Sequence, residues 1–456
     1  MSSVSPKLLA KRRLSRSEPL SGGAAFGVVW IGQVVSLFGS NLAGFVLGVW
    51  VYQQTKSVTA FSLISLLTVL PEIALLPVAG VIVDRFDRRL VMLLGVLGSG
   101  LCGVVLAALA VMGQLQLWHI YLMLMVSSAF ESVQFLALSA SITLLVSRHN
   151  LSRANGMVSL GTSIAMVAAP VLAGVFLQVL GLTKVLLINV AAYAFAVLTL
   201  CVVRIARPEK SFQTDEAPRS FWREAAQVWR YVTGQHELMA LLVLFAITNF
   251  STGMVQVLLP PYILSFKTPE ALGTIMSAGG VGVVAGSVLL SIWAGPRRKM
   301  RAIFVVSFIR GVVLFLAVLQ PSAVLIGAAA FIFLFCDPFI FTCSQTIWQT
   351  KVPADVQGRA FAIRRLVAWS TLPLAYLVAG PLADQVFEPW MAEQGPLARV
   401  VGGLFGTGPG RGIAVLFIVL GLLTVIAVAA GFLYQPLRDL EDRLPDAPSG
   451  AGSTQI

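Results

Sequence analysis

The chain has 456 residues, of which 57% are hydrophobic and 11% are charged, and its mean hydropathy is +0.87. Roughly a quarter of the residues of a soluble globular chain are charged, so this composition excludes a soluble multidomain protein and predicts segments that lie in lipid. The net charge of +12 alone would suit a nucleic-acid-binding protein, but that function also requires a basic groove with stacking aromatic side chains, and we expect no nucleic acid as a partner.

Segments that lie in lipid must satisfy their own backbone hydrogen bonds, so they form helices or a closed barrel. The apolar runs of this chain are near the roughly 20 residues that a helix needs to cross a bilayer, and they exceed the roughly ten residues of a barrel strand. We therefore predict an all-α polytopic membrane protein with twelve transmembrane helices. In chain order the predicted spans are 26–52, 58–83, 91–112, 117–145, 156–180, 184–203, 238–265, 272–294, 302–319, 321–349, 358–386 and 412–434.

One long connection, 204–237, divides the predicted spans into two bundles of six, which are 26–203 and 238–434. Residues 1–25 form a basic tail that leads into a first span too long for the apolar region of a cleavable signal peptide. Residues 435–456 form a C-terminal tail. The sequence thus predicts two helical bundles joined by a loop and flanked by two tails.

The basic residues predict the orientation of the helices. Of the 32 Lys and Arg residues, 26 lie on one side of the predicted bilayer and five on the other, while Arg310 lies within a span. Because Lys and Arg are retained on the cytoplasmic side, we expect both tails and the 204–237 loop in the cytoplasm and the protein in the cell membrane. Arg310 lies about 12 Å into its span by the helical rise, where we expect snorkelling or packing.

The sequence contains no recognisable metal site or catalytic cluster. The histidines lie at span ends or in loops, and no nucleophile–base constellation or ATP-binding motif is recognisable, so we expect neither a membrane enzyme nor a primary pump. We expect no metal and no other cofactor. The four cysteines fall within spans, where they are expected to be small core residues: Cys102, Cys201, Cys336 and Cys343.

A shift of 206 residues brings three features of the two bundles into register. Together they indicate that the second six spans repeat the first six. Two parallel halves of this kind are typical of one large class of transporters, whose binding site lies at the interface of the halves. The matching features are the acids Glu131 and Asp337 near the middle of their spans, the Arg-Ala pairs at Arg153 and Arg359, and the glycines Gly174 and Gly380, each near a proline.

Four spans that would face such an interface carry polar side chains at helical spacing, which places each set on one helix face. Such residues often hydrogen-bond neighbouring membrane helices, and helix–helix contact is the alternative for any one of them. Four such faces on four related helices favour a cavity. The candidate lining residues are Gln33, Ser36 and Ser40 on the first span, Gln134 on the fourth, Asn249, Thr252 and Gln256 on the seventh, and Ser344 on the tenth.

Three acids within spans are candidates for proton coupling: Glu131, Asp337 and Glu72. By the helical rise, Glu131 lies about 20 Å along its helix, near the bilayer centre. A charged side chain at that depth is costly, and such acids usually mark substrate or proton paths. The alternative is a neutral acid that hydrogen-bonds a neighbouring helix, and for Asp337 also a kink at Pro338.

A dense charged segment, GVIVDRFDRR, ends the second span at Gly80 to Arg89. Its arginines suit an anchor on the cytoplasmic side, but Asp84 and Asp87 weaken that signal. A carboxylate at Asp84 is well placed to meet the positive N-terminal end of a facing helix. We expect Arg88 and Arg89 to bond carboxylates or helix-end carbonyls. The matching turn of the second bundle, PRRKMR, has bases but no acid, so a latch between the bundles would be one-sided.

This segment resembles the cytoplasmic signature of the major facilitator superfamily, in which a glycine lies four residues before the Asp of D-R-x-G-R-R. Asp87 stands where the family glycine usually is, and this departure is similar to the branch of macrolide-efflux-type drug:proton antiporters. The stretches QVVSLFGSNL, LSRANGM, QGRAFAI and AGPLAD resemble the same branch. Members often carry an acid just after the glycine of the first span, whereas Ser40 and Asn41 follow Gly39 here.

The resemblance implies rocker-switch alternating access, a cavity at mid-membrane and proton-driven efflux of amphipathic compounds. We therefore expect a monomeric secondary transporter that exports an amphipathic, drug- or macrolide-like molecule by antiport, with the proton gradient as its energy source. A lipid or siderophore exporter, an importer of the same fold and a non-transporting membrane sensor are the alternatives. The expected cytoplasmic gate, in which the signature faces the start of span eleven, contains Gly80, Asp84, Arg85, Arg88, Arg89, Arg153 and Arg359.

Overall fold

The computed structural model describes residues 23–146, 150–203, 234–293, 295–320, 322–352 and 354–446. Within these residues, 12 helices are long and apolar enough to cross a membrane, which confirms the predicted all-α class and number of spans. The first half contains α1 (Gly23–Thr55), α2 (Val58–Arg85), α3 (Arg88–Val111), α4 (Leu117–Leu145), α5 (Leu151–Val179) and α6 (Gly181–Val202). The second half contains α8 (His236–Leu264), α9 (Pro269–Trp293), α10 (Lys299–Val318), α11 (Ala323–Phe335), α12 (Asp337–Lys351), α13 (Ala354–Pro381) and α16 (Arg411–Leu433).

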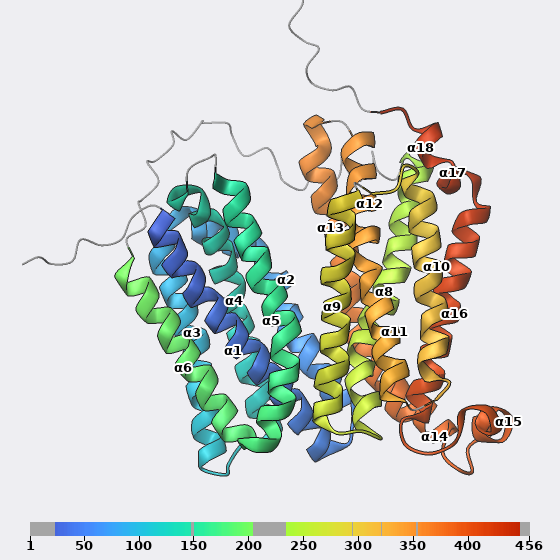
Figure 1. Ribbon diagram of the computed structural model, residues 1–456, viewed down its shortest axis with the longest axis horizontal. Coiled ribbons are helices and arrows are strands. Elements are labelled where there is room, and N and C mark those ends of the chain that lie inside the picture. Colours follow the sequence, from blue (N-terminus) through green and yellow to red (C-terminus); the bar gives the residue numbers. More distant parts are fainter. Residues whose placement is uncertain are drawn as a thin grey trace, which may run out of the picture.

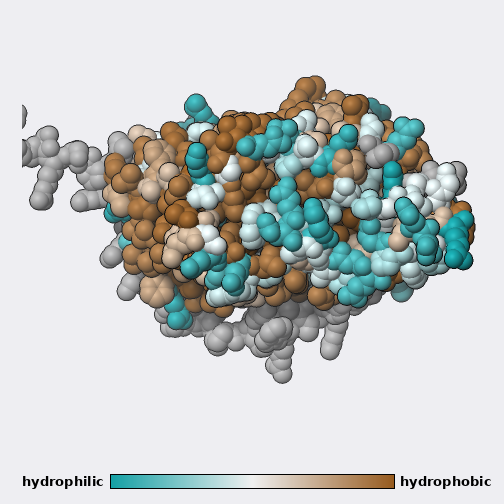
Figure 2. All heavy atoms as spheres, turned by 90° about the horizontal axis from the view of Figure 1, so that it is seen from below, coloured by the Kyte–Doolittle hydropathy of each residue, from teal (hydrophilic) through white to brown (hydrophobic). Residues whose placement is uncertain are grey.

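The helices form two groups that stand side by side, α1–α6 and α8–α16 (Figure 1). We call the end of the molecule at which α2 passes into α3 the basic end, and the end at which α1 passes into α2 the far end. The short helices α14 (Glu388–Trp390) and α15 (Pro396–Phe405) lie at the far end of the second half. Seen from the far end, hydrophilic residues gather mostly over this second half (Figure 2).

Buried apolar clusters show where the two halves meet. At the far end one cluster contains residues of both halves, among them Val58 of α2 and Tyr262 of α8. At the basic end one cluster lies entirely within residues 25–203, and another lies entirely within residues 238–440. The described cores therefore join the halves at the far end and leave each half with its own core at the basic end.

The glycines of the sequence repeat lie where helices of the two halves cross. A Cβ atom on Gly174 of α5 would lie 2.8 Å from the carbonyl oxygen of Pro269 on α9, and one on Gly380 of α13 would lie 2.6 Å from Ser62 Oγ on α2. Any larger side chain would push these helices apart, and small residues are the usual means of close approach between membrane helices. The repeated glycines thus serve equivalent contacts, α5 with α9 and α13 with α2.

Two spans depart from a continuous α-helix, and each departure carries an acid. The tenth span, expected at 321–349, divides at Cys336 into α11 and α12, and Asp337 begins α12. The eleventh span ends in a π-helix, η3 (Leu382–Phe387), which contains Asp384. Short π segments within membrane or soluble helices often occur at functional sites.

The first turns of α3 and α10 are capped by acids of different origin. Asp87 lies directly before α3 and accepts from Arg89 N at 2.9 Å. The PRRKMR turn before α10 has no acid, and there Glu441 of α18 (Leu440–Arg443) accepts from Lys299 N at 3.1 Å and Met300 N at 3.0 Å. The acid missing from the second turn is therefore supplied by the segment that follows the last span.

We expect Glu441→Ala to lower the free energy of unfolding by about 1 kcal/mol, because the first amides of α10 lose their cap. Thermal unfolding of the detergent-solubilised protein, followed by intrinsic fluorescence, measures the change. Asp442→Ala is the matched control, because the neighbouring Asp442 has an exposed side chain whose nearest ion pair, to Arg298, is 3.9 Å long. Equal melting temperatures for the two variants would contradict this role of Glu441.

Candidate functional site

Two cavities lie within the first half, one of about 330 Å³ and one of about 280 Å³. The larger, which we call the basic-side cavity, reaches Trp30 and Thr162 toward the basic end. The smaller, the far-side cavity, reaches Leu47 and Leu186 toward the far end. Residues lining both cavities mark the level at which they meet: Leu37, Ser40, Glu72, Ser128, Glu131 and Tyr193.

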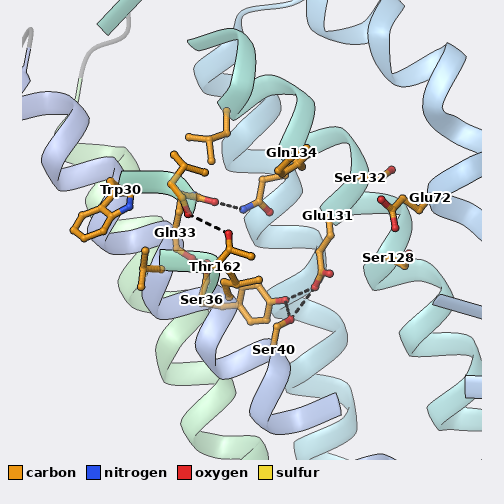
Figure 3. Close-up of a pocket in the computed structure, with 16 residues that line it drawn as sticks. Trp30, Gln33, Ser36, Ser40, Glu72, Ser128, Glu131, Ser132, Gln134 and Thr162 are labelled. Atoms are coloured by element: carbon orange, nitrogen blue, oxygen red, sulfur yellow. Dashed lines mark hydrogen bonds between the residues drawn. The ribbon is translucent and has the colours of Figure 1, made fainter. Parts of the chain in front are cut away.

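Glu131 of α4 is bound by hydroxyl groups from three helices. Its Oε1 accepts from Tyr193 Oη of α6 at 2.6 Å, from Ser40 Oγ of α1 at 2.9 Å and from Ser127 Oγ at 3.2 Å. Ser40 Oγ and Tyr193 Oη also share a hydrogen bond at 2.8 Å. Figure 3 shows the carboxylate pointing from α4 toward Ser40 on α1. The sequence-predicted residues Ser40 and Glu131 are thus brought into direct contact.

This arrangement gives a half-buried carboxyl group hydrogen bonds that water would otherwise supply. Hydrogen bonds to a charged acceptor are stronger than those between neutral groups, and they offset the cost of holding a charge at bilayer depth. All three donors meet Oε1, and the carboxyl group lines both cavities. The carboxyl group therefore lies at the boundary between two spaces that extend toward opposite ends of the first half.

Two amide side chains line the basic-side cavity one to two turns nearer the basic end. Gln134 Nε2 of α4 donates to Gln33 Oε1 of α1 at 2.6 Å (Figure 3). Gln33 Nε2 and Gln134 Oε1 are buried and make no hydrogen bond within the described part of the chain. Ser36 is also buried in this wall and donates to the backbone oxygen of Gln33 at 3.0 Å. Gln33 Nε2 and Gln134 Oε1 are therefore the two amide atoms of this pair without a described partner.

The walls around these polar groups are largely apolar. Trp30, Leu37, Phe135 and Leu138 contribute to the basic-side cavity. Trp30 Nε1 donates to the backbone oxygen of Met157 on α5 at 2.8 Å, which fixes the indole ring across the gap between α1 and α5. A few polar groups within an apolar wall are typical of sites that bind small molecules with both kinds of surface.

Glu72 of α2 enters both cavities from the side of α4 that is away from Ser40 in Figure 3. The charges that act on it are those of Arg365, on α13 of the second half, and of Glu131. Arg365 in turn stacks on the ring of Trp369, with its guanidinium carbon 4.1 Å from the ring centre. Glu72 is thus the cavity acid that is linked electrostatically to the second half.

Asp337 has a cationic partner that sequence reasoning did not identify. Arg310 Nη1 lies 2.7 Å from Asp337 Oδ1, and Arg310 Nη2 donates to Thr252 Oγ1 at 2.8 Å. The guanidinium carbon also lies 4.0 Å from the ring centre of Phe333. Arg310 is only 6% exposed, so it packs within the second half and does not snorkel to the surface. The two repeat-related acids therefore differ: Glu131 meets hydroxyl groups, whereas Asp337 meets an arginine.

The other cavity candidates of the second half lie apart from the two cavities. Gln256 accepts from Tyr376 Oη at 3.1 Å, and Ser344 is fully buried with an unpartnered hydroxyl group among the described residues. Asn249 lies half-buried on α8. Thr252 lines a small space beside Arg310 that has room for about one water molecule. The lining of these two cavities comes from the first half alone, whereas a third cavity, of about 590 Å³ at the far end, is lined by both halves, among them Tyr52 and Asp384.

The arginines of the charged segment at the end of α2 bind helix ends within their own half. Arg88 Nη1 donates to the backbone oxygen of Ala140 at 2.7 Å. Arg89 donates to the backbone oxygens of Leu200 at 3.0 Å and Cys201 at 2.7 Å, at the end of α6. The contacts of Arg89 use helix-end carbonyls, as the sequence suggested, whereas Arg88 binds a carbonyl more than one turn before the end of α4, and together they tie α3 to α4 and α6.

The remaining gate candidates are less constrained. Arg85 and Arg153 are exposed, and a Cβ on Gly80 would meet nothing within 4 Å. The backbones of Asp84 and Arg359 belong to α2 and α13, but their side chains lie outside the described part of the structure. The contact expected between Asp84 and the start of α13 stays a prediction.

Sequence reasoning also missed Tyr193, although a signal was present. Asn189 and Tyr193 are four residues apart on α6 and therefore share a helix face. Asn189 Oδ1 is buried without a described partner and lines the far-side cavity. Among the described residues, no group of three or more His, Cys, Asp and Glu side chains could hold a metal ion.

Comparison with known proteins identifies a matching family and relatives of this chain. The family model described as Major Facilitator Superfamily matches residues 29–375. Macrolide efflux protein A of Streptococcus pyogenes is 25% identical over 382 residues, which cover 82% of this chain and 93% of that protein. The multidrug efflux pump Tap of Mycobacterium tuberculosis is 25% identical over 343 residues, which cover 73% of this chain and 81% of that protein.

Solved structures of low sequence identity share the fold. A bacterial homologue of the human lysosomal transporter Spinster, in an inward-facing and unoccupied conformation, superposes with a TM-score of 0.69 at 14% identity, over 93% of this chain and 99% of that one. The nucleoside transporter NupG superposes with a TM-score of 0.66 at 12% identity, over 90% of this chain and 99% of that one.

Proposed function

The chain belongs to the Major Facilitator Superfamily, and we propose that it exports an amphipathic small molecule across the cell membrane in exchange for protons. Family membership makes it a multi-pass membrane transporter rather than an enzyme. The efflux pumps named among its relatives favour export over import. The excess of Lys and Arg at the basic end supports a cytoplasmic location for that end.

The position of Glu131 between the two cavities is the observation that carries this proposal. A proton-coupled antiporter needs one group that exchanges a proton with each side in turn and whose state depends on substrate. Glu131 lines both cavities, and its hydroxyl partners come from α1, α4 and α6. Movement of these helices relative to one another, within the first half, changes the hydrogen bonds of the carboxyl group and with them its hold on a proton.

In the proposed cycle, Glu131 takes up a proton in the state that is open at the far end. After the halves rock, the carboxyl group faces the basic-side cavity, and its O–H passes the proton to water there as substrate enters. Tyr193, Ser40 and Ser127 then donate to the carboxylate that is formed. The loaded transporter reopens at the far end and releases substrate, and the next proton arrives down its gradient.

The wall of the basic-side cavity supports an amphipathic cargo. Trp30, Leu37 and Phe135 offer apolar surface, while Gln33 and Gln134 add two amide side chains to the wall. Such a molecule would bury its apolar part against the rings and satisfy its polar groups on the amides. Macrolide-like and other drug-like compounds are members of this chemical class.

Uptake of substrate into inside-out vesicles under an imposed pH gradient tests the proposed function. Purified protein in inside-out vesicles, acidified inside, is expected to accumulate a macrolide such as erythromycin above its external concentration, because protons leave the lumen as substrate enters. Collapse of the gradient with an ionophore should end the accumulation. Equal distribution with the gradient intact, across a panel of macrolide and other drug-like compounds, would argue against antiport of this class and in favour of a sensor or another cargo.

A further inference from the structure

Asp384 makes a contact between the two halves that the family signature does not include. Its carboxylate accepts from Ser57 Oγ at 2.6 Å, Val58 N at 2.9 Å and Thr59 N at 2.8 Å. The three donors form the start of α2 in the first half, whereas Asp384 belongs to η3 at the end of the eleventh span. An acid of one half thus caps a helix of the other.

This contact satisfies a specific need of α2. The first amides of a helix have no partner within the helix, and the N-terminal end carries partial positive charge. Ser57 provides a weak cap of its own by accepting from Ala60 N at 3.2 Å, so Val58 N and Thr59 N depend on Asp384. Hydrogen bonds from backbone amides to a carboxylate are charge-assisted and strong.

The surrounding backbone holds Asp384 in register with α2. Gly380, one turn earlier, lets the α13 backbone touch Thr59 and Ser62. The π-helical turn that follows adds a residue to the helical repeat, which rotates Asp384 relative to a continuous α-helix. The close crossing at Gly380 and the π-helical turn η3 that follows it together direct the carboxylate of Asp384 toward the N-terminal end of α2.

The other acids that cap helices differ from Asp384, because each of them belongs to the same half as the helix that it caps. Asp87 caps α3 within the first half, Glu441 caps α10 within the second, and Glu388 caps α16 within the second through Gly410 N at 3.1 Å and Ile413 N at 3.0 Å. Rigid-body movement of the halves leaves those three caps intact. Of the four capping acids in the described residues, Asp384 alone acts across the halves.

We propose that Asp384 is the latch of the far-end gate: its cap on α2 holds the halves together when the basic end is open, and it breaks when the far end opens. The described buried cores agree, because the halves share a core only at the far end. The inference rests on the proposed alternating access. Because an opened far end loses all three hydrogen bonds at once, the latch stabilises one of the two states selectively.

With this latch, α2 and the eleventh span have one acid-to-helix contact at each end of the molecule. At the far end, the acid that ends the eleventh span caps α2. At the basic end, the sequence predicts the reverse contact, in which Asp84 at the end of α2 meets the start of α13. Rocking of the halves about a central axis lengthens one of these contacts as it shortens the other. Each acid therefore favours the state in which its own end is closed.

Electron–electron distance measurements between spin labels test the latch without any substrate. Labels are attached at Gln54→Cys and Lys267→Cys, which are exposed at the far end of each half, after the native cysteines have been replaced. In Asp384→Asn we expect the ratio of far-end-open to far-end-closed molecules to rise about tenfold, because the amide is uncharged and has one acceptor oxygen where the carboxylate uses two. Ser57→Ala, which removes one of the three donors to Asp384 together with the weak cap on Ala60 N, should shift the same distances by less.

Glu388→Gln is the matched control, because Glu388 lies near Asp384 but caps a helix of its own half. We expect it to lower the melting temperature without changing the distance distribution. An unchanged distribution in Asp384→Asn and Ser57→Ala, or an equal shift in Glu388→Gln, would overturn the latch. A shift in Asp384→Asn without any gradient-driven transport by the wild type would retain the latch and refute antiport, so the two proposals fail separately.

Discussion

Glu131→Gln is expected to abolish gradient-driven accumulation of substrate, with a loss of about 100-fold or more in the initial rate, because it removes the group that exchanges the proton. The amide has nearly the shape of the carboxyl group, and its oxygen can still accept from Tyr193, Ser40 or Ser127. The fold and the cavity should therefore survive. The measurement is uptake into acid-loaded vesicles, beside exchange of labelled for unlabelled substrate at equal pH on the two sides.

Exchange of labelled for unlabelled substrate at equal pH distinguishes a loss of proton coupling from a loss of substrate binding. If Glu131 carries the proton, the Glu131→Gln protein should still exchange substrate while it no longer responds to the gradient. Glu270→Gln is the matched control, because Glu270 is exposed at the far end of the second half and lines neither cavity. Tyr193→Phe, which removes the shortest of the three hydrogen bonds, should give an intermediate loss. Accumulation at the wild-type rate in Glu131→Gln would assign the carboxyl group to helix contact only.

The fold was largely predictable from the sequence because its dominant signal is local. Runs of about 20 apolar residues report the twelve spans directly, since a bilayer allows few alternatives to a helix of that length. The repeat of 206 residues also carried structural information, because Gly174 and Gly380 both lie at crossings between the halves. Interruptions within spans were not predictable, because hydropathy does not distinguish an α-turn from the π-turn at Leu382–Phe387.

The sequence predicted the acidic residues of the candidate site, but it did not predict most of the side chains that bind them. Helical spacing placed Ser40 and Glu131 on inward faces of their helices, and the structure brings them together. Tyr193 and Arg310 were missed because their roles depend on the rotation and neighbours of α6 and α10, which no local pattern fixes. Glu441 and Asp384 were missed for a related reason, since each caps a helix that is remote in the sequence.

Arg310→Leu is expected to destabilise the protein by about 1–3 kcal/mol, because it leaves the half-buried carboxylate of Asp337 without its counter-charge. Arg310 is 6% exposed and forms the only described ion pair of Asp337, at 2.7 Å. Thermal unfolding in detergent measures the loss. Arg301→Leu is the matched control, because Arg301 lies on the same helix but is exposed at the basic end, where such a change should cost little. Equal melting temperatures for Arg310→Leu and the wild type would show that the pair does not stabilise the fold.

The double variant Arg310→Leu with Asp337→Leu then separates stability from coupling. Replacing both members of an ion pair that is largely withdrawn from water by apolar residues is often neutral or stabilising, so the double variant should regain most of the melting temperature lost by Arg310→Leu. Transport by the double variant shows whether Asp337 also takes part in proton coupling or only stabilises the fold. A folded double variant that exchanges substrate but ignores the pH gradient would make Asp337 a second proton site, whereas one that still accumulates substrate would leave proton coupling to the first half. We expect the second result, because Asp337 is already neutralised by Arg310 and lines neither cavity, whereas Glu131 lines both.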